Sequence, residues 1–79
     1  MQINEIKRLA TEYTLEQLKA AEQALYNEST PEIPVEGVDE GEKLTHILAA
    51  IQIVEEVQQG NDLRTALRNF TNRVRNSIN

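Results

Sequence analysis

The only histidine, His46, stands one helical turn after Glu42, a spacing at which two side chains could share a metal ion. A catalytic zinc site takes three protein ligands and a structural site four, but the chain has no second histidine and no cysteine. The acidic stretch 38–42 lacks the alternating ligands of a calcium-binding loop. We therefore predict no metal and no cofactor, and expect His46 to make a local hydrogen bond at the border of an apolar helix face.

Glu22 is the carboxylate best placed for acid–base chemistry, because helical spacing sets it between Leu15 and Leu25 on the inward side of its helix. Partly buried carboxylates can act as general acids or bases. The alternative is an ion pair with an arginine of the last helix, and we favour it because a small aliphatic bundle rarely provides a catalytic pocket. Neither Ser29 nor Ser77 has a positioned base, and no glycine-rich phosphate loop exists, so we predict that the chain is not an enzyme.

Arginines gather at the end of the chain, where Arg64, Arg68 and Arg75 fall within a narrow arc of one helix and Arg73 lies on its other flank. Such a basic face could contact nucleic-acid phosphates, with the last two helices as a helix-turn-helix. However, residues 1–60 carry four bases and twelve acids, a balance of −8 that repels nucleic acid. We favour arginines that cover an apolar seam and pair with glutamates of the second and third helices.

The composition is that of one small globular domain spanning residues 1–79, with 39% apolar and 27% charged residues and a net charge of −5. A chain of this length has a marginal core, and without cysteines it has no disulfide to reinforce it. No apolar run is long enough to span a membrane, and the N-terminal residues do not form a signal or transit peptide. The cytoplasm is the expected location.

The elements that position these side chains are helices, because apolar residues recur at helical spacing along most of the chain. Thr14 and Gln17 form a capping box, Asp39 and Glu42 form another, and Gly60 is suited to end the third helix. We predict an all-α bundle in which the first two helices form a bent pair and the last two an antiparallel hairpin. Its four helices are approximately 3–11, 15–27, 40–59 and 62–78.

Residues 29–38 interrupt the helical pattern with Pro31 and Pro34. Ile33 and Val35 are spaced to lie on one side of an extended segment. We predict a crossover loop that these two side chains pin to the bundle. An exposed edge that pairs with a partner strand is the alternative, and the prolines disfavour it.

The third helix has a wider apolar arc than a surface helix needs, formed on one side by Ala49, Ala50, Ile53 and Val57. This arc serves either the core, as in a central helix, or a second chain. Self-association is one way for so small a domain to gain stability. These four residues are therefore the candidate interface, and a symmetric homodimer through the third helix is the expected assembly.

Two classes of function remain open on this sequence. The first is a non-catalytic protein–protein interaction or self-associating module, and the second is a nucleic-acid-associated or regulatory adaptor that uses Arg64, Arg68 and Arg75. The first is favoured, because the acidic body opposes nucleic acid. The sequence names no ligand and no particular partner.

Overall fold

The computed structural model describes residues 2–77, which form four helices and no strand. The prediction of a small all-α fold is confirmed, and each predicted helix bound lies within one residue of the observed one, although Ile78 lies outside the described residues. None of the four helices combines the length and the apolar character needed to cross a membrane. The helices are α1 (Ile3–Glu12), α2 (Leu15–Tyr26), α3 (Glu40–Gln58) and α4 (Leu63–Ser77).

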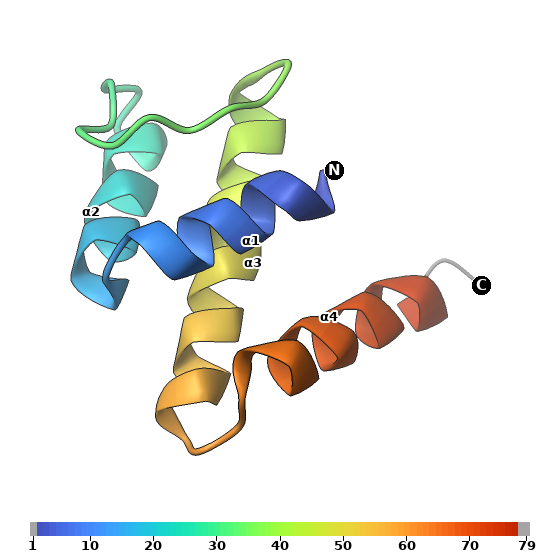
Figure 1. The fold of residues 1–79 in the computed structure, drawn as a ribbon. Helices are drawn as coiled ribbons and strands as arrows, with labels where there is room; N and C mark the ends of the chain where they lie inside the picture. Colours follow the sequence, from blue (N-terminus) through green and yellow to red (C-terminus); the bar gives the residue numbers. More distant parts are fainter. Residues whose placement is uncertain (1, 78–79) are drawn as a thin grey trace.

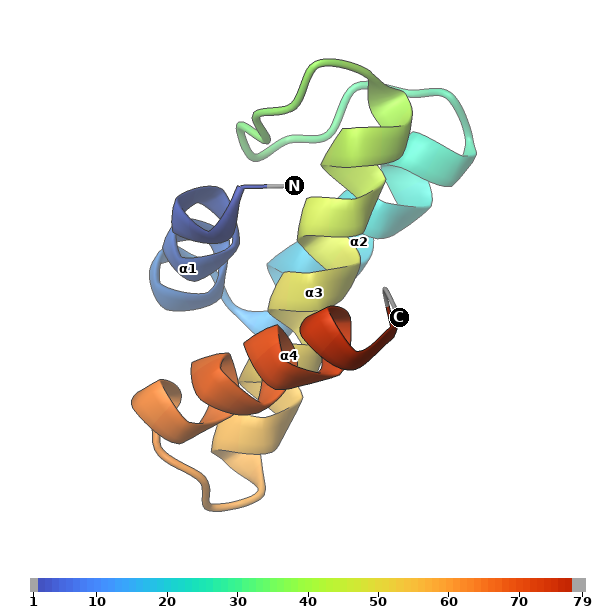
Figure 2. The same ribbon diagram turned by 90° about the vertical axis from the view of Figure 1, so that its right-hand side faces the viewer.

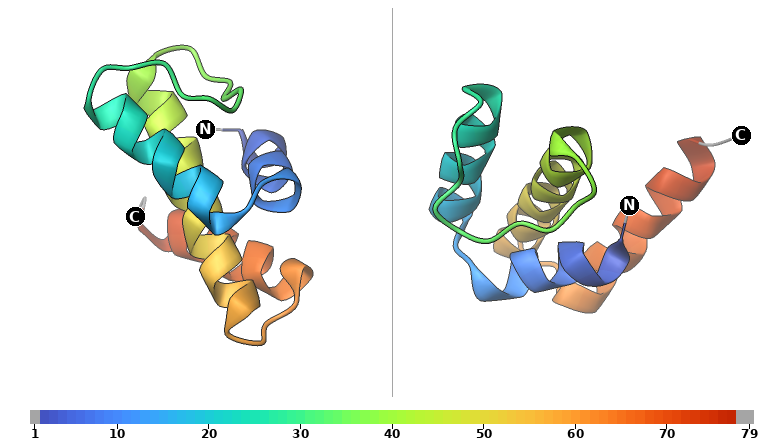
Figure 3. Two further views of the ribbon diagram at one scale, coloured as in Figure 1. Left: turned by 90° about the vertical axis from the view of Figure 1, so that its left-hand side faces the viewer. Right: turned by 90° about the horizontal axis from the view of Figure 1, so that it is seen from above.

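The central element is α3, on which each of the other three helices packs. In Figure 1, α1 crosses in front of α3, while α2 and α4 lie on opposite sides of it. The view from above in Figure 3 also shows α2 and α4 on either side of α3, diverging from each other. The apolar arc of the third helix is therefore wide because this helix has three neighbours within its own chain.

Local signals set the helix ends. The Thr14 hydroxyl accepts from the Gln17 N–H while the Gln17 side chain accepts from the Thr14 N–H, which completes the predicted capping box. Asp39 accepts from the Glu42 N–H, but the Glu42 carboxylate accepts from the Val38 N–H instead of returning to Asp39. At the end of α3 the backbone adopts a φ of 107° at Gly60, a conformation that favours glycine.

The course of α4 corrects the prediction of an antiparallel hairpin. The connection from α3 is short, yet α4 runs obliquely across α3 and does not lie along it, as Figures 1 and 2 show. The reason is that α4 covers two helices at once. Its Ala66 and Phe70 are buried in one cluster with Ala49 and Ile53 of α3 and Ile6 of α1.

The segment between α2 and α3 is the crossover predicted from its prolines. Ile33 is buried in the cluster formed by α1, α2 and α3, and Val35 packs against that cluster from a half-buried position. The prediction that these two side chains pin the loop is confirmed. Their burial brings the backbone of residues 34–36 over α1, where it meets two charged side chains described below.

Candidate functional site

His46 is a structural residue in the centre of the fold. Its side chain is fully buried. Its Nδ1 donates to the Glu36 carbonyl at 2.8 Å, and its Nε2 accepts from the Gln2 backbone N–H at 3.0 Å. His46 is hydrogen-bonded, as predicted, but the prediction of a local bond at a helix border is wrong, because both partners lie outside α3 and the side chain is fully buried. Because both ring nitrogens are engaged, the imidazole holds the start of α1 and the crossover on α3.

Glu5 is a buried acid that the sequence reading did not single out. Only 4% of its surface is exposed. Its carboxylate accepts from Arg8 Nε at 2.8 Å and Arg8 Nη2 at 2.6 Å, and from the Glu36 N–H at 2.9 Å. Arg8 also donates to the Pro34 carbonyl at 2.9 Å, and its guanidinium lies 5.8 Å from the centre of the Tyr13 ring. We call Glu5, Arg8 and His46 the polar junction.

The electrostatics of the polar junction follow from these contacts. The hydrogen bonds from Arg8 lower the pKa of Glu5, against the burial that raises it, and the Glu36 N–H lowers it further. The same pairing raises the pKa of Arg8 above its ordinary value. Glu5 is thus held as a carboxylate with partners for both oxygens. A carboxylate in this state does not take up protons readily, which makes it a poor general base.

One signal in the sequence could have identified Glu5. It lies four residues before Leu9 and one before Ile6, so helical spacing places it on the inward stripe of α1. Arg8 stands three residues later, within reach of an ion pair. The other hydrogen-bond partners of Glu5 and Arg8 are backbone groups of the crossover, and no local sequence pattern predicts these contacts.

Glu22 does not have the partner predicted for it. The residue is half-buried on α2, and among residues 2–77 it forms no ion pair with an arginine of α4. The reason is the arrangement of the helices, since α3 lies between α2 and α4 (Figure 1).

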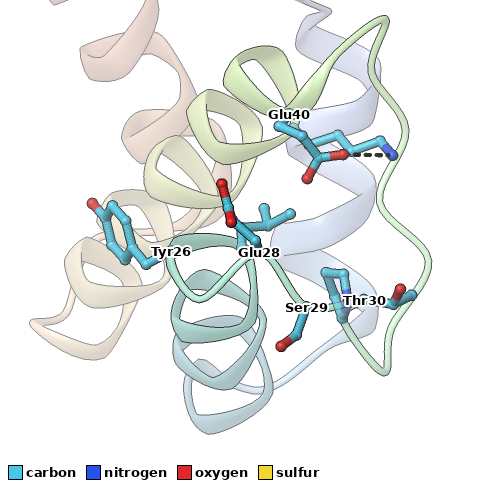
Figure 4. Close-up of a pocket in the computed structure, with 8 residues that line it drawn as sticks. Tyr26, Glu28, Ser29, Thr30 and Glu40 are labelled. Carbon is cyan, nitrogen blue, oxygen red and sulfur yellow. Dashed lines mark ion pairs between the residues drawn. The ribbon is translucent and has the colours of Figure 1, made fainter.

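A depression of about 510 Å³ lies where α2 ends and α3 begins. Its lining includes Glu28, whose backbone has a φ of 59°, a conformation that is uncommon for a residue with a side chain. Figure 4 shows that the polar groups around it point in different directions, and that the Glu40 carboxylate is turned toward Lys43, 3.7 Å away. No three metal-ligating side chains gather here or elsewhere within residues 2–77. The depression therefore lacks the convergent polar groups of an active site.

The predicted basic face, hereafter the arginine face, consists of Arg64, Arg68 and Arg75. All three side chains are exposed, and none forms an ion pair with any residue in the range 2–77. Asp62, the acid nearest in sequence, uses its carboxylate to cap α4 by accepting from the Thr65 N–H at 2.7 Å. The hydrogen bonds with Thr65 lower the pKa of Asp62, and the nearby charges of Arg64 and Arg68 lower it further. Pairing of the arginine face with glutamates of its own chain, as predicted, is therefore not observed.

Arg73, on the other flank of α4, behaves as predicted for the whole group. It forms an ion pair with Glu56 of α3, which ties the two helices together. The same helix thus carries one arginine used internally and three directed outward.

Comparison with known proteins assigns the chain to a family without assigning a role. A family model described as a family of unknown function, DUF6952, matches residues 1–79. The chain belongs to DUF6952. The searches of curated proteins and of solved structures found no match. The function of this DUF6952 protein must therefore be argued from its own surface.

The predicted interface on the third helix of the DUF6952 protein needs correction. Ala49, Ala50 and Ile53 are at most 4% exposed, because neighbours within the same chain cover them. Ala49 and Ile53 lie in a cluster with α1 and α4, and Ala50 lies in a cluster with α1 and α2. Only Val57 is exposed, at 39%, beside an apolar groove of about 180 Å³ that also includes Ala10 and Leu63. The sequence could not distinguish a core-facing surface from an intermolecular interface here, because both consist of apolar residues on one arc of the helix. The surface that remains distinctive is the arginine face.

Proposed function

We propose that this protein is a non-catalytic protein-interaction module that self-associates through the arginine face of α4. One observation carries the proposal: Arg64, Arg68 and Arg75 are exposed on one arc without an ion pair among the described residues. Arg8 and Arg73, by contrast, each pair with a glutamate of their own chain. Among the arginines of residues 2–77, the three of the arginine face are those without an ion pair, and they therefore remain available to another molecule.

Carboxylates of a protein suit this face better than the phosphates of nucleic acid. A guanidinium can bind a carboxylate through two parallel hydrogen bonds. Residues 1–60 carry a balance of −8, so a second copy offers many carboxylates, while the same charge repels a polyanion. Nucleic-acid surfaces also commonly present aromatic rings for stacking, but Phe70, the aromatic residue of α4, is only 7% exposed.

Apolar groups next to the arginine face support a contact that excludes water. Leu67 precedes Arg68 and follows Arg64 by three residues, and Thr71 lies within four residues of both Arg68 and Arg75. Both side chains are half-buried in the monomer. An interface that combines such a strip with arginines has the composition typical of protein contacts. We propose the cytoplasm as the compartment in which this association occurs.

The test is the molar mass in solution across a range of concentrations, measured by light scattering or sedimentation equilibrium. We expect the wild-type mass to rise above the 9.0 kDa monomer in the micromolar range and to fall again as salt is added. The variant R64Q/R68Q/R75Q should raise the dissociation constant by about tenfold or more, because each ion pair contributes up to about 1 kcal/mol.

The matched control is R73Q, which removes a charge from the same helix but on the flank that faces Glu56. It should leave the dissociation constant within about twofold of the wild type. A wild-type protein that stays monomeric at all concentrations would overturn the proposal. So would salt-sensitive binding of labelled DNA or RNA that is lost in R64Q/R68Q/R75Q, since that result would assign the face to nucleic acid.

A further inference from the structure

A groove of about 430 Å³ runs between α2 and the crossover, on the side of the molecule away from α4. Its floor is apolar and shallow, because small side chains line α2 at this point. We call it the α2 groove. The residues that define it are Glu16, Ala20, Ala24, Thr30, Glu32 and Ile33.

Two carboxylates flank the apolar floor of the α2 groove. Glu16 and Glu32 are both exposed, and neither forms an ion pair with another residue of the range 2–77. Ala20 is exposed and Ala24 half-buried, so a helix could approach the backbone of α2 closely. The groove is thus complementary to the arginine face, with acids and small apolar residues opposite arginines, Leu67 and Thr71.

We infer that the α2 groove of one copy receives α4 of a second copy, with Glu16 and Glu32 accepting hydrogen bonds from the arginine face. This inference rests on the proposed self-association and names its receiving surface. The rise from Glu16 to Ala24 along α2 is about 12 Å and that from Arg64 to Arg75 along α4 is about 16.5 Å, so the groove receives part of the length of the arginine face.

The placement of the two surfaces determines the kind of assembly. The α2 helix, which lines the groove, and α4 lie on opposite sides of α3 in both Figure 1 and Figure 3. One contact therefore leaves a free groove on one copy and a free arginine face on the other. Association of this kind is head-to-tail, unlike the symmetric homodimer expected from the sequence.

Two variants test the inference, because each replaces the charged residues of one of the two contacting surfaces by uncharged glutamine. R64Q/R68Q/R75Q keeps an intact groove, and E16Q/E32Q keeps an intact arginine face. Each variant alone should associate about tenfold more weakly than the wild type. An equimolar mixture restores one wild-type contact, so we expect its mass to rise with concentration and to stop at two copies, twice the 9.0 kDa monomer.

The matched control for the groove is E12Q/E55Q, which neutralises two exposed glutamates that do not line it. It changes the net charge by the same amount and should associate like the wild type. If R64Q/R68Q/R75Q abolishes association but E16Q/E32Q does not, the groove assignment fails while the proposed function stands. A mixture that stays monomeric also overturns the assignment, whereas a monomeric wild type overturns both proposals.

Discussion

The polar junction and the arginine face contain the same kinds of charged residue in opposite circumstances. At the junction, the crossover lies over α1, and Glu5 and Arg8 bind each other and backbone groups of residues 34–36. On α4, Arg64, Arg68 and Arg75 face solvent without an ion pair among the described residues. The difference lies in the neighbours, because α1 is covered by a loop and this side of α4 is not.

This comparison separates the cations that form ion pairs within the chain from those that remain exposed to solvent. A charge removed from water is costly unless hydrogen bonds replace the lost hydration, and the junction supplies them for both members of its ion pair. An exposed arginine has no such requirement and contributes little to stability by itself. We therefore expect changes at the junction to affect folding, and changes on the arginine face to affect association.

The largest effect on stability is expected from Glu5→Gln. The substitution removes the negative charge from a site that is 4% exposed and leaves Arg8 without its ionic partner. Because the Arg8 side chain is 28% exposed and can regain some hydration, we expect a loss of about 2–3 kcal/mol in the free energy of unfolding, measured in urea. Glu12→Gln, an exposed position on the same helix, should change it by less than about 0.5 kcal/mol. Equal effects of the two variants would contradict the assignment of Glu5 to the junction.

A smaller effect should appear in the pH dependence of stability. The pKa of Glu5 in the folded chain lies below its ordinary value of 4.5, chiefly because of the hydrogen bonds from Arg8. A group with a lowered pKa stabilises the fold fully above its unfolded value, and this contribution is lost as the pH falls through the folded value. The stability difference between wild type and Glu5→Gln should therefore be constant near pH 7 and shrink below about pH 4.5. A difference that does not change between pH 7 and pH 3 would show that Glu5 is not ion-paired in solution.

The smallest effect on stability is expected from the arginine face. R64Q/R68Q/R75Q removes three exposed charges that have no ion pair in the described structure, so the free energy of unfolding at monomeric concentrations should change by less than about 0.5 kcal/mol. Urea unfolding at low micromolar protein concentration measures this free energy, and Glu5→Gln is measured under the same conditions for comparison. A loss as large as that of Glu5→Gln would mean that these arginines pair within their own chain, and would remove the contrast between the two regions.

Much of the fold was predictable because its signals are local. Thr14 with Gln17, Asp39 next to the start of α3, and Gly60 at its end act on backbone groups within a few residues of themselves. Ile33 and Val35 likewise point to one side of the crossover whatever lies beneath them. Such features depend on spacing alone, which the sequence states directly.

The candidate site was predictable only in part. The sequence placed Arg64, Arg68 and Arg75 on one arc, and the structure leaves that arc exposed. It did not place Glu22 correctly relative to α4, because α3 lies between α2 and α4. It also left open whether Ala49, Ala50 and Ile53 serve the core or a second chain. The structure buries all three within the chain, Ala49 and Ile53 against α1 and α4 and Ala50 against α1 and α2.

The amino-acid sequence by itself determined the four helices, their ends and the positions of charged residues around each helix axis. Hydrogen bonds and helical periodicity act over a few residues, so these properties do not depend on the rest of the fold. The tertiary structure alone decided which charged residues are covered. Glu5 is buried because a loop about thirty residues away crosses above it. The arginine face is open because α4 packs against α3 and α1 through its other side, which carries Ala66 and Phe70. Burial depends on how elements distant in sequence pack together, and that packing encloses Glu5 and leaves three arginines exposed.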